Sequence, residues 1–213
     1  MLEAYLLTLL GVAAAQAAPG PNLMAVASAA IGQGRMPALF VTLGISTGML
    51  IWAVGVSYGL GTVFTVYPLS LIALKVIGGS YLLLLAFRAS KSAFKNQPAS
   101  IKADAVAKTH SSSWKSGVLV VLTNPKAALM WSAVATFLFG SGLDTWQVAL
   151  FGPVGAISGL VIYGSYALLF STDTAIAFYK KSTRLVESVF SAAFALLGGK
   201  LLIDGIRTLR QSF

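Results

Sequence analysis

Cysteine is absent from the 213-residue sequence, which excludes disulfide bonds, thiolate metal ligands and dithiol redox chemistry. Histidine occurs once, at His110 in a polar stretch, so a histidine-based metal site is not expected. The long apolar stretches also lack paired carboxylates. Because the sequence offers neither a nucleophile with its base nor a redox group, we expect no enzyme, no metal and no cofactor.

Charged residues are also scarce, at 10% of the chain, where a soluble domain has about a quarter. Hydrophobic residues make up 57% of it. Six apolar stretches are each near or above the ~20 residues that a membrane-spanning helix needs. They cover residues 5–31, 36–62, 66–87, 116–140, 146–171 and 186–206. The sequence therefore predicts an all-α integral membrane protein with six transmembrane helices in a lipid bilayer.

The net charge of +9 comes from basic residues between the apolar stretches rather than on one soluble face, so we expect no nucleic-acid partner. If the N-terminus is outside, the cytoplasmic side collects Arg35, Arg88, Lys91, Lys95, Lys102, Lys108, Lys115, Lys180, Lys181 and Arg184. The outside then receives only Arg207 and Arg210. The positive-inside rule therefore predicts that both chain termini lie outside.

The start of the chain needs a separate check, because Ala15-Gln16-Ala17 follows an apolar run and resembles a signal-peptidase site. The segment before it contains Glu3 and no lysine or arginine, so the basic region of a signal peptide is missing. We expect this segment to remain as the first helix.

Two proline motifs interrupt the apolar stretches. In Ala18-Pro19-Gly20-Pro21-Asn22, two prolines remove two backbone donors and obstruct the carbonyls four positions earlier, so a helix must break there. In Thr123-Asn124-Pro125-Lys126, the asparagine is predicted to cap a helix that starts at the proline. A break at membrane depth is tolerated only where it is buried in protein or lines a polar cavity, so both breaks are candidate binding sites.

The two halves of the sequence match in the order of their motifs. Pro21 corresponds to Pro125, residues 44–52 to residues 155–163, and Gly78-Gly79 to Gly198-Gly199. Because each half has three predicted helices, the second half enters the membrane from the opposite side. The halves are then inverted repeats, the symmetry that alternating access uses. The predicted organisation is a first three-helix repeat at 1–97, a cytoplasmic basic connector at 98–114 and a second repeat at 115–213.

The chemistry of the breaks suits a free amino acid, which carries a carboxylate and an ammonium group. Half-helices that begin at Pro21 and Pro125 direct unpaired N–H groups at the breaks, where a carboxylate can bind. Carbonyls released at Ala15, Ala17 and Val121 suit an ammonium group. The predicted substrate-binding residues are Pro19, Gly20, Pro21, Asn22, Asn124, Pro125, Lys126 and Lys75. The alternative is that both breaks are structural kinks.

Three lysines lie inside apolar segments, where a charge costs at least ~2.5–3.5 kcal/mol. Lys126 adjoins the second break and is the first candidate for binding a carboxylate, while Lys75 either does the same or forms an interhelical pair. Lys200 stands four residues before Asp204, so a structural salt bridge is expected there. Asp204 and Glu187 are the candidates for proton coupling, although snorkelling also accounts for Glu187.

Three motifs, in order, resemble those of the LysE/RhtB family of bacterial amino-acid exporters. They are Ala18-Pro19-Gly20-Pro21-Asn22, LKVIGGSYL at 74–82 and LTNPKA at 122–127, and the resemblance covers the whole chain. It implies a secondary transporter in the bacterial cytoplasmic (inner) membrane that exports amino acids or related metabolites, driven by the proton-motive force. An ion exporter of the same superfamily and a non-transporting structural membrane protein are the alternatives.

The sequence departs from part of that family at Met49, where an acidic residue can follow the glycine of the second helix, so proton coupling would need another group. The patterns Gly44 to Gly48 and Gly55 to Gly59 allow close helix packing. With the family resemblance they suggest a homodimer, although such glycines equally pack helices within one subunit. The aromatic residues that could line an apolar pocket, or simply pack, are Trp52, Tyr81, Trp131 and Tyr163.

Overall fold

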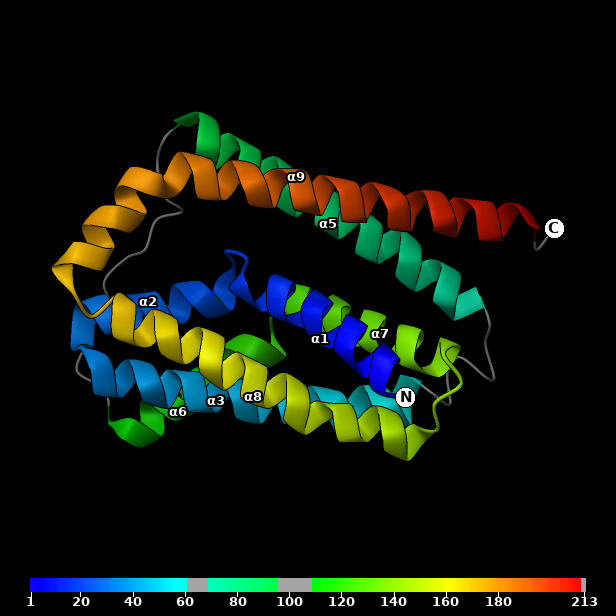
Figure 1. Ribbon diagram of the computed structural model, residues 1–213, viewed down its shortest axis with the longest axis horizontal. Helices are drawn as coiled ribbons and strands as arrows, with labels where there is room; N and C mark the ends of the chain where they lie inside the picture. Colours follow the sequence, from blue (N-terminus) through cyan, green and yellow to red (C-terminus); the bar gives the residue numbers. More distant parts are fainter. Residues whose placement is uncertain (61–68, 96–108, 212–213) are drawn as a thin grey trace. The chain divides into compact units, whose positions relative to one another are not determined.

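The computed structural model describes residues 1–60, 69–95 and 109–211, and these ranges are helical with no strand (Figure 1). For some helical residues, among them Lys75, Pro125 and Asp204, the description covers the backbone alone. The prediction of an all-α protein is confirmed for this part of the chain. Its residues group into two compact units, Met1–Gly61 with Ile101–Ala177, and Thr62–Ser100 with Phe178–Phe213.

The first unit is built around two helix pairs that are each interrupted by a break. Its helices are α1 (Leu2–Ala17), α2 (Pro21–Gln33), α3 (Arg35–Gly55), α6 (His110–Leu122), α7 (Pro125–Gly140) and α8 (Thr145–Leu169). A π-helical turn, Val56–Leu60, continues α3. Along its length α3 lies against α6 and α8, while α1 packs on α7 and α8, and α2 packs on α3 and α8 (Figure 1).

The contact between α3 and α6 is made backbone to backbone. A Cβ atom on Gly44 would collide with the carbonyl oxygen of Trp114, and one on Gly117 would collide with the carbonyl oxygen of Val41. Gly48 makes room for a side chain of α6, because a Cβ atom there would collide with Cγ1 of Val121. Close packing at the first glycine pattern is therefore confirmed, and it occurs within one chain. The homodimer stays a prediction.

The second unit contains α5 (Leu69–Lys95) and most of α9 (Asp173–Gln211), which lie side by side (Figure 1). A Cβ atom on Gly79 would come within 2.9 Å of the carbonyl oxygen of Gly198. Farther along, Ser191 Oγ donates a hydrogen bond of 2.9 Å to the carbonyl of Ala86. The two glycine motifs that correspond between the halves of the sequence thus face each other.

The outer surface of the helices is rich in apolar side chains. Leu10, Phe94 and Leu196, for example, are 69%, 85% and 75% exposed, which suits contact with lipid rather than water. Among the described residues, three helices are long and apolar enough to span a membrane, and up to five spans result if each bent pair counts as one. Six spans are not confirmed, because the predicted span at 66–87 begins outside the described residues and continues in α5.

Both predicted helix breaks are present. The axes of α1 and α2 are bent by 50°, and those of α6 and α7 by 61°. As predicted, α7 begins at Pro125 with Asn124 as its N-cap. However, α6 begins at His110, since Thr109 caps it by accepting a hydrogen bond from the Ser112 N–H. The last residues of the predicted connector are therefore helical, and the boundaries of the two repeats stay predictions.

Candidate functional site

The first break consists of Ala18, Pro19 and Gly20, between α1 and α2. Ala18 leaves the helix with extended backbone (φ −66°, ψ 141°), and Gly20 is extended as well. Because neither Pro19 nor Pro21 has an N–H, the helical hydrogen bonds to the carbonyls four positions earlier cannot form. The carbonyls around the end of α1 therefore need donors from elsewhere.

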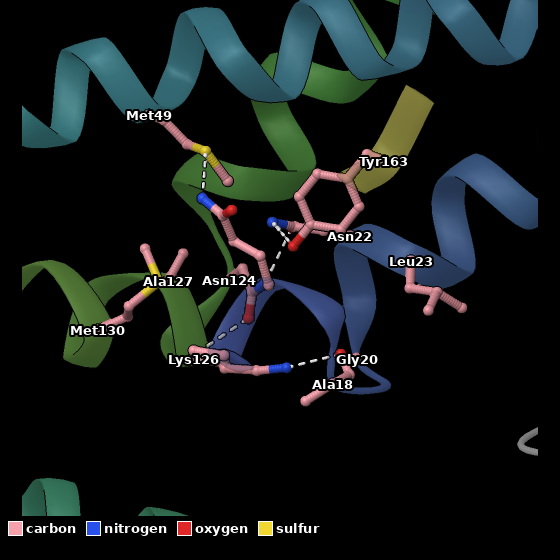
Figure 2. Close-up of a pocket in the computed structure, with 12 residues that line it drawn as sticks. Ala18, Gly20, Asn22, Leu23, Met49, Asn124, Lys126, Ala127, Met130 and Tyr163 are labelled. Carbon is pink, nitrogen blue, oxygen red and sulfur yellow. Dashed lines mark hydrogen bonds between the residues drawn. The ribbon is translucent and has the colours of Figure 1, made fainter. Parts of the chain in front are cut away.

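Side chains from two other helices provide these donors. Tyr166 of α8 donates a hydrogen bond of 2.8 Å to the carbonyl of Ala17. Lys126 of α7 donates from Nζ to the carbonyl of Ala18 at 2.8 Å (Figure 2). The same Nζ donates to the carbonyl of Pro19 at 3.3 Å. The Lys126 side chain is only 9% exposed, and its bonds to the carbonyls offset the cost of burying the amine.

Two asparagines connect the breaks directly. Asn124 Nδ2 donates a hydrogen bond of 2.9 Å to Asn22 Oδ1, and Asn22 Nδ2 donates one of 3.4 Å to the hydroxyl of Tyr163 (Figure 2). All three side chains are buried. The sequence analysis singled out both asparagines, and the structure brings them together with Pro19, Gly20, Pro21, Pro125 and Lys126 where the two junctions meet.

The second break is closed by its own asparagine and by one tryptophan. Asn124 Oδ1 accepts a hydrogen bond of 3.0 Å from the backbone N–H of Lys126, which caps α7. Trp52 Nε1 of α3 donates a hydrogen bond of 3.0 Å to the carbonyl of Val121. The carbonyl of Val121 thus lacks a bond from Pro125, as expected, but it accepts from Trp52 and, at 3.4 Å, from the backbone N–H of Asn124.

The N-terminus of α2 differs from that of α7. Its N-cap is Gly20, and the described structure has no side-chain cap there. Pro21 at the first position has no N–H, and the next two residues, Asn22 and Leu23, both line the pocket described below. Both half-helices were expected to offer N–H groups to a carboxylate. Asn124 takes that place at α7, whereas no side chain caps the first turn of α2 in the described structure.

Gln16 of α1 is a buried residue of the site that the sequence analysis did not recognise. Its Nε2 donates a hydrogen bond of 2.9 Å to the carbonyl of Gly155, and its Oε1 accepts one of 2.8 Å from Ser158 Oγ. Met49 Sδ lies 3.5 Å from the same Nε2. The available signal was a single amide side chain just before a helix break in an apolar run, because a buried amide needs partners.

The two breaks and their neighbours enclose a small pocket in the first unit (Figure 2). Its free volume is about 10 Å³, close to the room that one water molecule needs, and so too small for an amino acid. Its lining combines polar side chains with two methionines, Met49 and Met130, which adapt readily in shape. The lining residues are Ala15, Gln16, Ala18, Gly20, Asn22, Leu23, Met49, Asn124, Lys126, Ala127, Met130 and Tyr163.

Three predicted residues, Lys75, Glu187 and Asp204, belong to the second unit. The side chains of Lys75 and Asp204 lie outside the described part of the structure, so their roles, and the pairing of Asp204 with Lys200, stay predictions. Glu187 is 2% exposed, and its Oε1 has no hydrogen-bond partner among the described residues. Its role in proton coupling also stays a prediction.

Comparison with known proteins bears on what this arrangement of broken helices is for. The family model of the LysE type translocator matches residues 13–205. The chain belongs to the LysE type translocator family. The resemblance found in the three sequence motifs is thereby confirmed, and the protein is a membrane protein of a transporter family.

Relatives of this LysE type translocator include two kinds of efflux protein. It is 26% identical over 190 residues to the threonine efflux protein of Escherichia coli K12, covering 87% of this chain and 91% of the relative. It is 27% identical over 186 residues to the homoserine/homoserine lactone efflux protein of Salmonella typhimurium, covering 86% and 88%. An uncharacterized membrane protein of Haemophilus influenzae is 26% identical over 199 residues, covering 88% and 90%. No solved structure gives a significant match.

Proposed function

We propose that this LysE type translocator is a secondary transporter that exports amino acids or closely related metabolites from the bacterial cytoplasm. The observation that carries the proposal is the meeting of two helix breaks, where a buried amine, backbone carbonyls and the N-terminus of α2 surround one pocket. A zwitterion needs partners of both signs, and broken helices offer them at membrane depth. Relatives named for threonine and homoserine efflux support this substrate class.

The substrate carboxylate is placed between Lys126 and the first turn of α2. Both are hydrogen-bond donors with positive charge or partial positive charge, and both line the same pocket. The bond between Asn22 and Asn124 holds these two donors at a fixed separation. The flexible side chains of Met49 and Met130, which also line the pocket, can adapt to the side chain of the substrate.

The architecture proposed for transport is six spans in two inverted three-helix repeats, in the cytoplasmic membrane with both termini outside. In each half, a bent pair of helices is followed by a long apolar span, α3 after α1 and α2, and α8 after α6 and α7. This repetition supports the proposed symmetry. A homodimer is proposed on the family resemblance alone, and crosslinking in membranes that yields only monomer would contradict it.

We propose that the proton-motive force drives export and that a carboxyl group of the second unit, Glu187 or Asp204, couples proton entry to it. Support comes from the burial of Glu187 and from its Oε1, which lacks a hydrogen-bond partner among the described residues. We expect Glu187→Gln to abolish the stimulation of export by a pH gradient and to leave exchange of labelled for unlabelled substrate intact. Export that still responds fully to the gradient would exclude Glu187 as the coupling residue.

Transport in proteoliposomes tests the proposed function. Vesicles are loaded in turn with labelled amino acids, including threonine and homoserine, and exit is followed with and without an imposed pH gradient, against vesicles without protein. Exit that depends on the protein and is accelerated by the gradient is the expected result. If folded, inserted protein moves no amino acid, labelled metabolites and ions are tested in the same vesicles. Failure of all of them would favour a structural membrane protein.

A further inference from the structure

We propose that the carbonyls of Ala18 and Pro19 form the subsite for the ammonium group of the substrate, and that Lys126 occupies this subsite as a built-in competitor until the substrate displaces it. The inference rests on the proposed export function and adds a ligand class, namely compounds with a free ammonium group. It assigns Lys126 two successive partners, first the backbone carbonyls and then the substrate carboxylate.

The two carbonyls are the fixed half of this contact. They lie between α1 and α2, where the backbone is extended rather than helical, and Lys126 Nζ bonds them at 2.8 and 3.3 Å. The neighbouring carbonyl of Ala17 already accepts a hydrogen bond from Tyr166. A lysine amine sits on a flexible four-carbon stem, whereas the backbone at the break is held at both ends by helices. The donor can therefore leave, and the acceptors stay in place.

The pocket must enlarge before an amino acid can enter it. Its free volume of about 10 Å³ does not admit an amino acid while Lys126 extends along the break. A Cβ atom on Gly20 would lie 3.3 Å from both Cδ and Nζ of Lys126, so the lysine stem runs directly beside the backbone of the break (Figure 2). When the Lys126 side chain withdraws, the carbonyls of Ala18 and Pro19 and the space beside them become available to the substrate.

The exchange also conserves hydrogen bonds. The ammonium group of the substrate takes over the carbonyls, and the released Lys126 amine is then available to the substrate carboxylate, so neither side is left with an unsatisfied buried group. An N-acetylated amino acid or a 2-hydroxy acid offers one neutral donor in place of the ammonium group, so it would replace the bonds of Lys126 to the two carbonyls only in part. Such ligands should bind poorly, because a site built for a polar group rejects analogues that lack it.

Binding of propylammonium to the purified full-length protein tests the subsite without a carboxylate. In the wild type, propylammonium competes with Lys126, whereas in Lys126→Ala the two carbonyls are free. We expect the dissociation constant of propylammonium to be roughly tenfold or more lower in Lys126→Ala than in the wild type. This factor corresponds to the free energy of one hydrogen bond to a charged group. Two controls should show no comparable change: 1-propanol as an uncharged probe of the same size, and Lys115→Ala, which removes an exposed lysine of α6.

Unchanged propylammonium affinity in folded Lys126→Ala would overturn the proposal, and so would an equal gain for 1-propanol, which would indicate a cavity without preference for charge. If Lys126→Ala does not fold, Lys126→Gln replaces it. Glutamine keeps an N–H donor without the charge or the full reach of lysine, so a smaller gain in the same direction is expected. No gain in Lys126→Gln overturns the proposal in the same way.

The transport assay separates this inference from the proposed function. Amino-acid export by the wild type, together with unchanged amine binding in Lys126→Ala, would overturn the role of Lys126 as competitor and leave export standing. A gain in amine binding without export of any amino acid would support the ammonium subsite and contradict the proposed function.

Discussion

The two helix breaks differ in where their hydrogen-bond partners come from. At the second break, Asn124 caps its own helix and Thr123 Oγ1 donates back to the carbonyl of Leu119 at 2.7 Å, and Trp52 of α3 adds one donor from a distant helix. At the first break, the donors Lys126 and Tyr166 come from helices that are distant in sequence. A local partner cannot leave without unfolding its own turn, whereas a long side chain from another helix can. The first break is therefore the one suited to exchange with a ligand.

The largest effect is expected from Lys126→Met, which removes the donor that links the breaks and keeps most of the side-chain volume. Export in proteoliposomes should fall roughly a hundredfold or more, because hydrogen bonds of a charged group are worth about 1.5–3 kcal/mol each. Lys115→Met removes an exposed lysine and should keep the wild-type rate. Export within a few-fold of the wild type would mean that the first break does not depend on Lys126.

Two substitutions at Asn124 separate its local role from its role between the breaks. Alanine removes both the cap of α7 and the bond to Asn22, so the free energy of unfolding should fall by about 1–2 kcal/mol and export should be lost. Serine can still cap a helix but is too short to reach Asn22. We expect Asn124→Ser to recover most of the stability and little of the export, measured on the same preparations. Full recovery of export in Asn124→Ser would mean that Asn124 contributes to export only by capping α7.

A smaller difference in export rate is expected between Tyr166→Phe and Trp52→Phe. Each substitution deletes one side-chain donor to a backbone carbonyl at a helix break. Either change should lower the free energy of unfolding by about 0.5–1.7 kcal/mol, the range for side-chain hydrogen bonds in membranes. Tyr166→Phe leaves the Ala17 carbonyl to compete for Lys126, so export should fall. Trp52→Phe, at the second break, should leave the export rate unchanged. Equal losses of export would remove the distinction between the breaks.

The smallest effect on the export rate is expected from Gly20→Ala. Gly20 has extended backbone (φ 172°), so alanine fits without strain, but its Cβ would lie 3.3 Å from Lys126 and shift the amine slightly. Export should change by roughly twofold to fivefold, equivalent to less than about 1 kcal/mol. Gly11→Ala in α1 is the matched control, since a Cβ there meets nothing within 4 Å, and it should leave export unaltered. A similar change in both variants would exclude an effect through Lys126.

Local backbone chemistry explains why the breaks were predictable from the sequence. The missing N–H groups of Pro19 and Pro21 and the asparagine before Pro125 act within a few residues, so their consequences follow from the sequence alone. Hydropathy likewise predicted the all-α membrane fold, while the count of six spans stays unconfirmed because part of the chain lies outside the described residues.

The partners of the breaks were not predictable in the same way. Gln16 with Gly155, Tyr166 with Ala17 and Trp52 with Val121 are pairs made by tertiary packing of helices far apart in sequence. A single sequence contains the hydrogen-bonding capacity of these residues but not their neighbours. The capping of α7 by Asn124 was predicted, but its second bond, to Asn22 at the other break, depends on the same tertiary packing.

The backbone contact between α3 and α6 has a mechanical consequence. Gly44 and Gly117 each receive a carbonyl oxygen of the opposite helix, so sliding one helix along the other would drive that oxygen into a neighbouring side chain. These two helices can therefore move only as one rigid body. Because α6 ends at Leu122 and α7 begins at Pro125, the second break is attached directly to this rigid pair.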